Sequence, residues 1–282
     1  MQFEIFRLSV VPQIRPPIIE YIDQTRPKKT RSEFLENAFE NSYKFQHRRS
    51  TLVYKFDIRD HHHVLAMIGR QIEKTGYGPP ESSFQPIKID WWARSHVVFD
   101  LSAETTGQKV AVLRQGEVGE PFTVLKSLID HINKKNKDED WKIEFEPMAS
   151  KSNFWKIYLE KQKSITQVKF DLVVPNILGA HGELTEFAKQ VWDQEHAQKF
   201  TLGLSADPGQ LQLKTERLEA AVTYSHSGGG RATLKAKGKI VYDSHKEIVT
   251  REMKDFPHTP IDTDVSRRNF LRLLIPHLLR DE

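Results

Sequence analysis

Alternating and helical hydrophobic patterns follow one another through the first half of the chain. Short apolar or alternating runs predict β-strands at 2–11, 51–58, 87–92, 96–101 and 109–114. Helical spacing of apolar residues predicts helices after Ser32, over 62–74 and near 121–134. Ser32 and Asp60 suit the N-cap positions of the first two helices. The Gly-, Pro- and Ser-rich stretch 76–86 is typical of a loop, and SAETTGQ is typical of a hairpin turn.

A second series of elements follows residue 141. Strands are expected at 141–148, 165–177 and 199–206, with helices near 152–161 and over 183–197. Residues 218–243 combine a helix or strand, which the local pattern leaves open, with a Gly-rich turn and a further strand. The last helix begins after Ser266, and Pro276 inside it predicts a kink or a break one turn earlier. The pattern predicts an α+β protein of two mixed lobes, 1–150 and 165–282, with largely antiparallel sheets and a C-terminal helix.

The amino-acid composition excludes several kinds of site chemistry but says less about the fold. The chain has no cysteine, which excludes disulfides, thiolate catalysis, cysteine-ligated zinc and iron–sulfur clusters. No apolar run approaches the roughly 20 residues that span a bilayer, and the N-terminus lacks the basic leader of a signal peptide. We therefore expect a cytoplasmic protein without a membrane span, and no motif predicts a cofactor.

Basic residues are the main functional signal. Lys and Arg total 42 against 38 Asp and Glu, so the net charge is only +4 and its distribution matters more than its size. The cationic residues gather in three clusters: Arg26, Lys28, Lys29 and Arg31; Arg48 and Arg49; and Arg231, Lys235, Lys237 and Lys239. On a strand, the last four would share one face and follow a phosphate backbone. The alternatives are a solubilising edge strand for 231–239 and an ordinary exposed loop for 26–31.

Four further motifs carry weaker signals. Gly228, Gly229 and Gly230 precede the third basic cluster, and their backbone N–H groups would suit a phosphate if they were exposed. Asp243 with Glu252 and Lys254 loosely fits the carboxylates and lysine of a metal-dependent nuclease. The run His61–His63 is more typical of a solvated helix start than of a metal site, so no metal ligand is assigned. The pair Trp91–Trp92 would stack on bases or, more commonly, divide between two faces of a strand.

The order of several segments resembles a family of bacterial phage-defence proteins that includes RexA and KwaB. The similarity lies in SEFLENAF followed by STLVYKFDI, then HVVFDLSAETTGQKVAVL, the helix at 121–134, and WKIEFEPMASKSNFWKIYLEKQKSITQVKFDLVVP. It covers about two-thirds of the chain as a pattern. The resemblance implies a dimeric, sequence-tolerant DNA-binding protein that senses phage DNA or replication complexes. The resemblance assigns no catalytic residue to this chain.

Three hypotheses follow. The first is a homodimeric DNA-binding protein of anti-phage defence that contacts phosphates through its basic clusters. The second is a metal-dependent nuclease using Asp243, Glu252 and Lys254. The third is a non-catalytic subunit of a defence complex, whose Leu-rich C-terminal helix (266–282) docks a partner protein or a second copy; the alternative for this helix is that it closes the core of its own chain.

Overall fold

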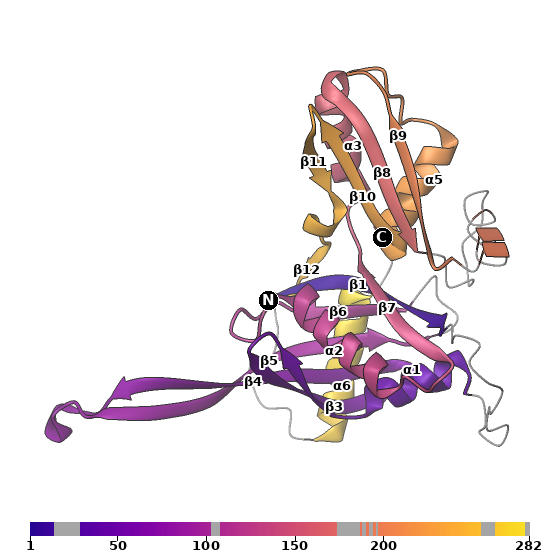
Figure 1. The fold of residues 1–282 in the computed structure, drawn as a ribbon. Coiled ribbons are helices and arrows are strands. Elements are labelled where there is room, and N and C mark those ends of the chain that lie inside the picture. The colour runs from indigo at the N-terminus through magenta and orange to yellow at the C-terminus, as the bar shows by residue number, and fades with distance from the viewer. Residues whose placement is uncertain are drawn as a thin grey trace.

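The protein folds into two lobes, each built on an antiparallel sheet (Figure 1). The computed structural model describes residues 1–13, 29–102, 108–173, 187, 190–191, 194–195, 197–254 and 263–279. The α+β class and the antiparallel sheets predicted from the sequence are confirmed. Arg26, Lys28, most of the helix predicted at 183–197 and the tip of the turn after residue 102 lie outside these residues.

The first lobe contains an eight-stranded sheet. Its strands are β1 (Gln2–Pro12), β2 (Tyr43–His47), β3 (Ser50–Asp60), β4 (His63–Tyr77), β5 (Pro86–Asp100), β6 (Lys109–Leu113), β7 (Trp141–Pro147) and β12 (Thr250–Glu252). The order is β12-β1-β6-β5-β4-β3-β2, and β7 also pairs with β1. Its helices are α1 (Arg31–Glu40), α2 (Pro121–Lys135) and α6 (Asp264–Leu278).

The second lobe contains a four-stranded sheet covered on one face. Its order is β11 (Lys239–Asp243), β10 (Gly230–Ala236), β8 (Ile165–Val173) and β9 (Lys199–Ser205). Helices α3 (Lys151–Lys161) and α5 (Glu216–Tyr224) cover one face, because Phe154 and Leu218 share a core with Phe170 and Leu234 of the strands. The opposite face of this sheet carries mainly polar side chains, among them Lys169, Asp171 and Thr201.

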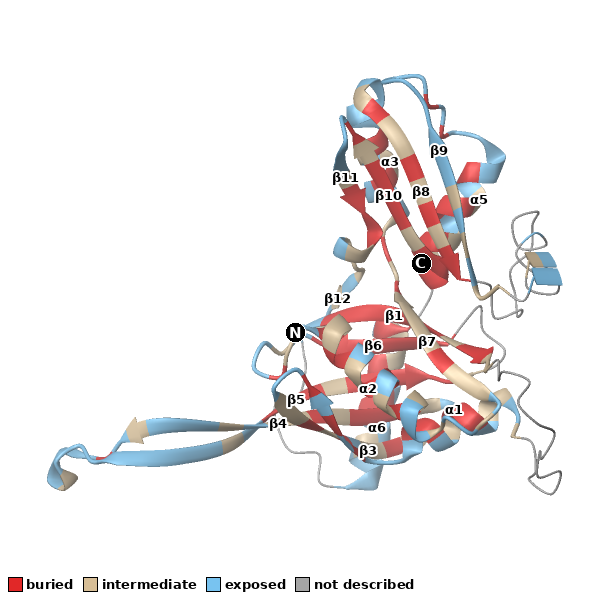
Figure 2. Ribbon diagram, in the orientation of Figure 1, coloured by how far each residue is buried: buried red, intermediate tan, exposed pale blue. Residues whose placement is uncertain are grey.

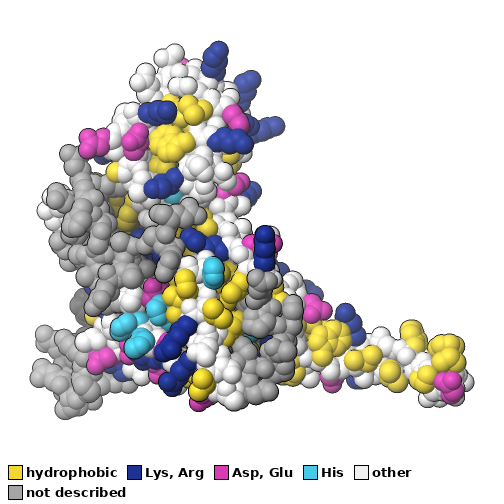
Figure 3. Space-filling model, turned by 180° about the vertical axis from the view of Figure 1, so that it is seen from behind, with side chains coloured by type: hydrophobic (Ala, Val, Ile, Leu, Met, Phe, Trp, Pro, Cys, Tyr) yellow, Lys and Arg dark blue, Asp and Glu magenta, His cyan; other side chains and the backbone are white. Residues whose placement is uncertain are grey.

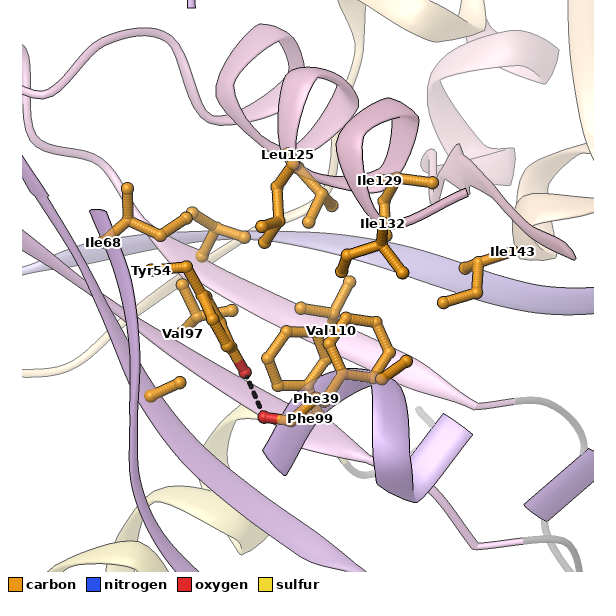
Figure 4. Close-up of a cluster of buried hydrophobic side chains, with 14 of the residues drawn as sticks. Phe39, Tyr54, Ile68, Val97, Phe99, Val110, Leu125, Ile129, Ile132 and Ile143 are labelled. Atoms are coloured by element: carbon orange, nitrogen blue, oxygen red, sulfur yellow. Dashed lines mark hydrogen bonds between the residues drawn. The ribbon is translucent and has the colours of Figure 1, made fainter. Parts of the chain in front are cut away.

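The core of the first lobe forms where α1 and α2 pack on the sheet (Figure 4). Phe39 of α1 stacks on Phe99 of β5 with ring centroids 4.1 Å apart. The hydroxyl of buried Tyr54 donates a 2.7 Å hydrogen bond to the carbonyl of Phe39, which satisfies the only polar atom of a large apolar side chain. Helix α1 begins after Thr30, which forms a capping box with Glu33, and not after Ser32 as predicted.

The helix predicted over 62–74 is wrong, because this segment is strand β4. Val64 and Ala66 face the core under α1 and α2, whereas Leu65 faces the opposite core. A strand buried on both faces presents a continuous apolar run, which periodicity does not distinguish from a buried helix.

Because 62–74 is a strand, Asp60 caps no helix. It ends β3 before a two-residue turn and pairs with Arg272 of α6 at 2.7 Å. The two strands predicted at 87–92 and 96–101 are one continuous strand, β5.

The C-terminal segment returns to the first lobe. Strand β12 pairs with the start of β1, and Phe270, Leu271 and Leu274 of α6 are buried against the face of the first sheet opposite α1 and α2. The predicted division placed this segment with residues 165–282, which the packing corrects. The helix closes the core of its own chain, and it continues through Pro276 to Leu278. Among the described residues, no helix is long and apolar enough to cross a membrane.

The Gly-rich turn, residues 228–230, is closely packed where the two lobes meet. Residues 228–230 are buried, so their backbone is not an open phosphate cradle as the sequence suggested. A Cβ on Gly228 would overlap the side chain of Arg7 in β1, and Gly228 has a φ of +81°. A Cβ on Gly230, whose φ is +146°, would overlap the carbonyl of Asp171 and lie 2.9 Å from Cα of Leu172. Only glycine fits at both positions.

We expect Gly230→Ala to destabilise the protein by roughly 3 kcal/mol or more, because it combines a glycine-only φ with a backbone clash. Gly238→Ala is the matched control. Gly238 also has a positive φ, +76°, but a Cβ there meets open space, so about 1 kcal/mol is expected. Urea unfolding of both variants measures the difference. Equal losses would show that the close packing of Gly230 against strand β8 contributes nothing.

Candidate nucleic-acid interface

The three basic clusters predicted from the sequence do not share one surface. Lys29 and Arg31 lie at the start of α1, Arg48 and Arg49 form the β2–β3 turn, and the 231–239 segment belongs to the second lobe (Figure 1). Local contacts also engage two of these cations. Lys29 pairs with Glu139 at 2.7 Å, and the Arg31 guanidinium lies 4.9 Å above the Trp141 ring. Lys29 and Arg31 therefore brace α1 against the start of β7.

Arg231 is held in a structural ion pair with Asp243, unlike the lysines that follow it. Its guanidinium donates two hydrogen bonds to Asp243, of 2.8 and 2.6 Å, across strands β10 and β11. Burial raises the pKa of Asp243, but the hydrogen bonds and charge of Arg231 outweigh this effect and hold the pKa below its usual value. The pair ties the two strands together and leaves little of the Arg231 charge for a ligand.

A cluster that the sequence did not reveal forms at the distal end of the second lobe. Lys161 ends α3, Lys163 precedes β8, and Lys235, Lys237 and Lys239 lie on and around the β10–β11 turn. Ala236 pairs with Ile165 in the sheet, and the hydroxyl of Thr166 donates to the carbonyl of Lys235. This pairing brings 161–163 beside 235–239. We call Lys161, Lys163, Lys235, Lys237 and Lys239 the distal lysine cluster.

The distal lysine cluster is open to solvent. Four of its lysines are exposed and Lys235 is half-buried, and none of the five is within ion-pair distance of a carboxylate among the described residues. Figure 3 shows Lys and Arg side chains gathered at this upper end of the molecule. Lys237 has a φ of +50° in a two-residue hairpin turn, a position where asparagine or glycine is usual.

Positive charge is therefore divided unequally between the two lobes. In the described part of the second lobe, 151–173 and 197–249, Lys and Arg clearly outnumber Asp and Glu. The modest net charge of +4 for the whole chain conceals this positive lobe. A dense group of lysines on a protruding end concentrates positive potential more than the same charge dispersed over a surface.

The nuclease residues do not assemble. Asp243 is held by Arg231 in the second sheet, whereas Glu252 pairs with Gln2 in the first sheet and Lys254 follows it. No group of three His, Asp or Glu residues among those the structure describes is arranged to hold a metal ion. The His61–His62 pair forms the β3–β4 turn, where Asp60 is engaged by Arg272. The geometry gives the nuclease hypothesis no support.

A buried histidine lies at the base of the same lobe. His226 Nδ1 lies 2.7 Å from the carbonyl of Val222, and its Nε2 lies 2.6 Å from the Tyr242 hydroxyl. A neutral ring that donates from Nδ1 and accepts at Nε2 satisfies both contacts. Burial lowers the pKa of His226 to about 4, so the ring stays neutral near pH 7. With both nitrogens occupied, His226 is a structural group and not a general base.

The comparisons with known proteins add no family. No protein-family model matches the chain, and no curated protein is significantly similar to it. Function is therefore inferred from the geometry of this chain and from the sequence resemblance.

Lowering the pH should weaken the second lobe through His226. In the unfolded chain the ring has a pKa near 6.5, against about 4 when folded, so stability falls as the pH drops from about 6.5 to about 4. The expected loss is on the order of 3 kcal/mol over that range. Free energies of unfolding measured at several pH values should depend less steeply on pH in His226→Asn. The same slope in both proteins would contradict the assignment.

Proposed function

We propose that this protein binds nucleic acid, with DNA favoured, through the phosphate backbone, and that the distal lysine cluster makes the contact. The convergence of two lysine-bearing segments, about 70 residues apart in sequence, on one exposed end carries the proposal. Each lysine that neutralises a phosphate releases condensed counterions, which provides affinity without reading the base sequence. A sequence-tolerant contact is therefore the expected mode.

The composition of the cluster supports phosphate rather than base recognition. Lysine ammonium groups are point charges on flexible stems, whereas base reading favours planar arginine or amide side chains. The five members are all lysines. Lys237 adopts a left-handed backbone conformation at a cost of about 1 kcal/mol, which is consistent with a position retained for its side chain.

The wider role follows from the resemblance to phage-defence proteins. It favours DNA over RNA, a cytoplasmic location and a homodimer. Two copies would present two distal lysine clusters to one DNA, and a second contact on the same molecule raises the apparent affinity well above that of one cluster. This combination suits a protein that senses DNA without a defined sequence.

Replacing Lys235, Lys237 and Lys239 with Gln should weaken binding to a mixed-sequence DNA duplex. The slope of log K against log salt should fall by roughly 2–3, since each phosphate contact contributes about 0.9 to the slope. Lys44, Lys55 and Lys134 of the first lobe provide the control. They are exposed, and the same triple change to Gln lowers the net charge equally.

Electrophoretic mobility shifts over a salt series measure both triple variants against the original protein. A loss confined to the second-lobe variant supports the proposal, and a second DNA of unrelated sequence should give the same result. Equal losses in the two variants would show that the loss of binding depends only on net charge. Unchanged binding in the Lys235, Lys237 and Lys239 variant would place the contact elsewhere.

A further inference from the structure

A two-stranded arm projects from the first lobe. Strands β4 and β5 pair continuously from His63↔Asp100 to Tyr77↔Pro86, but the sheet neighbours β3 and β6 stop at Arg70 and Val97. Residues 71–92, which we call the arm, therefore extend beyond the sheet. Figures 1 and 2 show the arm reaching away from both lobes with largely exposed residues.

The register gives the arm one apolar face. Directly paired residues lie on the same face of an antiparallel ribbon, so Ile72 and Trp91 share a face with Ile89 and Ile87. This face continues the one on which Ile68 and Ala93 are buried under the helices. The other face carries mainly polar residues: Gln71, Glu73, Thr75, Lys88 and Asp90, with Tyr77 and Trp92.

Beyond Ile72, which packs against the core of the first lobe, the described part of the chain does not cover the apolar face. Ile87 and Ile89 are 45% and 44% exposed, and Lys74 lies 4.9 Å above the Trp91 ring on the same side. Tyr77 and Phe84 add exposed aromatic rings near the tip, and Figure 3 shows hydrophobic side chains along the arm. An isolated two-stranded ribbon is at best marginally stable in water. The alternation of polar and apolar residues is that of a ribbon with one buried face.

The charges of the arm argue against nucleic acid as its partner. Glu73, Glu81 and Asp90 are opposed by only Lys74 and Lys88, so the arm has a slight negative charge. Phosphate binding and anionic membranes both require a positive surface. A nearly neutral, apolar ribbon instead fits another apolar protein surface.

A second copy of this arm meets that requirement. About a two-fold axis, two identical apolar faces stack against each other at the ~10 Å spacing of packed sheets. Seven residue steps from Arg70 to Tyr77 give a face about 24 Å long. Stacking two such faces buries an area at the low end of specific interfaces, below about 1,200 Å² in total. An area of that size predicts a weak, concentration-dependent dimer.

We propose that the arm is the dimerisation element, and that the face formed by Ile72, Ile87, Ile89 and Trp91 packs against the same face of a second copy. The inference deepens the proposed function, because it rests on the homodimer named there and identifies the surface that forms it. It is independent of DNA contact by the distal lysine cluster, which lies on the other lobe.

Sedimentation equilibrium over a concentration series tests the assignment. The original protein should change from monomer to dimer at concentrations on the order of micromolar. The double variant Ile87→Asn with Ile89→Asn should raise the dissociation constant at least about tenfold, by loss of apolar burial from both copies. Lys88→Asn is the matched control, since it introduces the same residue between these two positions but on the opposite face, and it should dimerise normally.

The outcomes distinguish the arm assignment from the proposed homodimer. Thermal unfolding at a concentration where all variants are monomeric should give matching midpoints, because Ile87, Lys88 and Ile89 do not pack on the lobe. A dimer that Ile87→Asn with Ile89→Asn leaves intact, or that Lys88→Asn weakens equally, overturns the arm assignment and retains the homodimer. A monomer at every concentration overturns both. A dimer that persists when Lys235, Lys237 and Lys239 are changed to Gln separates assembly from DNA binding.

Discussion

The close approach of Gly228 to strand β1 is the constraint on which the arrangement of the two lobes depends. Gly228 packs against the Arg7 side chain, Arg7 donates to the carbonyl of Ser227, and the N–H of Ala149 donates to the carbonyl of His226. Strand β1 also pairs with β6 on one edge and with both β7 and β12 on the other. One strand therefore connects the start, middle and end of the chain. A side chain at 228 would push the second lobe away from β1, and one at 230 would push β10 away from β8 within the second lobe.

This constraint keeps the junction of the lobes apart from the two surfaces proposed for binding and dimerisation. The junction uses the base of the second lobe, where Arg231–Asp243 and His226–Tyr242 lock β10, β11 and the turn. The opposite end of the same strands is left with lysines that have no structural partner among the described residues. Ion pairs thus remove charge where the lobe must pack and leave it where the lobe meets solvent. The arm is likewise separate, because it extends from the far end of the first sheet.

The sequence predicted most of the fold but only part of the candidate site. Apolar spacing located α1, α2, α3 and α6, since each buries one stripe, as Leu125 and Ile129 of α2 do. It failed at β4, where Val64 and Leu65 are buried in two different cores. It also missed the arm, because Ile87, Ile89 and Trp91 read as an ordinary half-buried strand and local pattern does not show whether a neighbouring element exists. Lys161 and Lys163 became relevant only through the pairing of β8 with β10, a contact between distant segments.

The same reasoning explains why net charge is a poor guide for this chain. Arg231 lies in the most basic segment of the sequence, yet a buried carboxylate, Asp243, engages it fully. Lys163 lies in a segment with no clear sequence signal, yet folding places it beside Lys235, Lys237 and Lys239. Whether a cation serves structure or binding is decided by the residue across the sheet from it, and that residue is set by strand register. Register in turn depends on which face each strand buries, so the proposed binding surface is a consequence of the hydrophobic core.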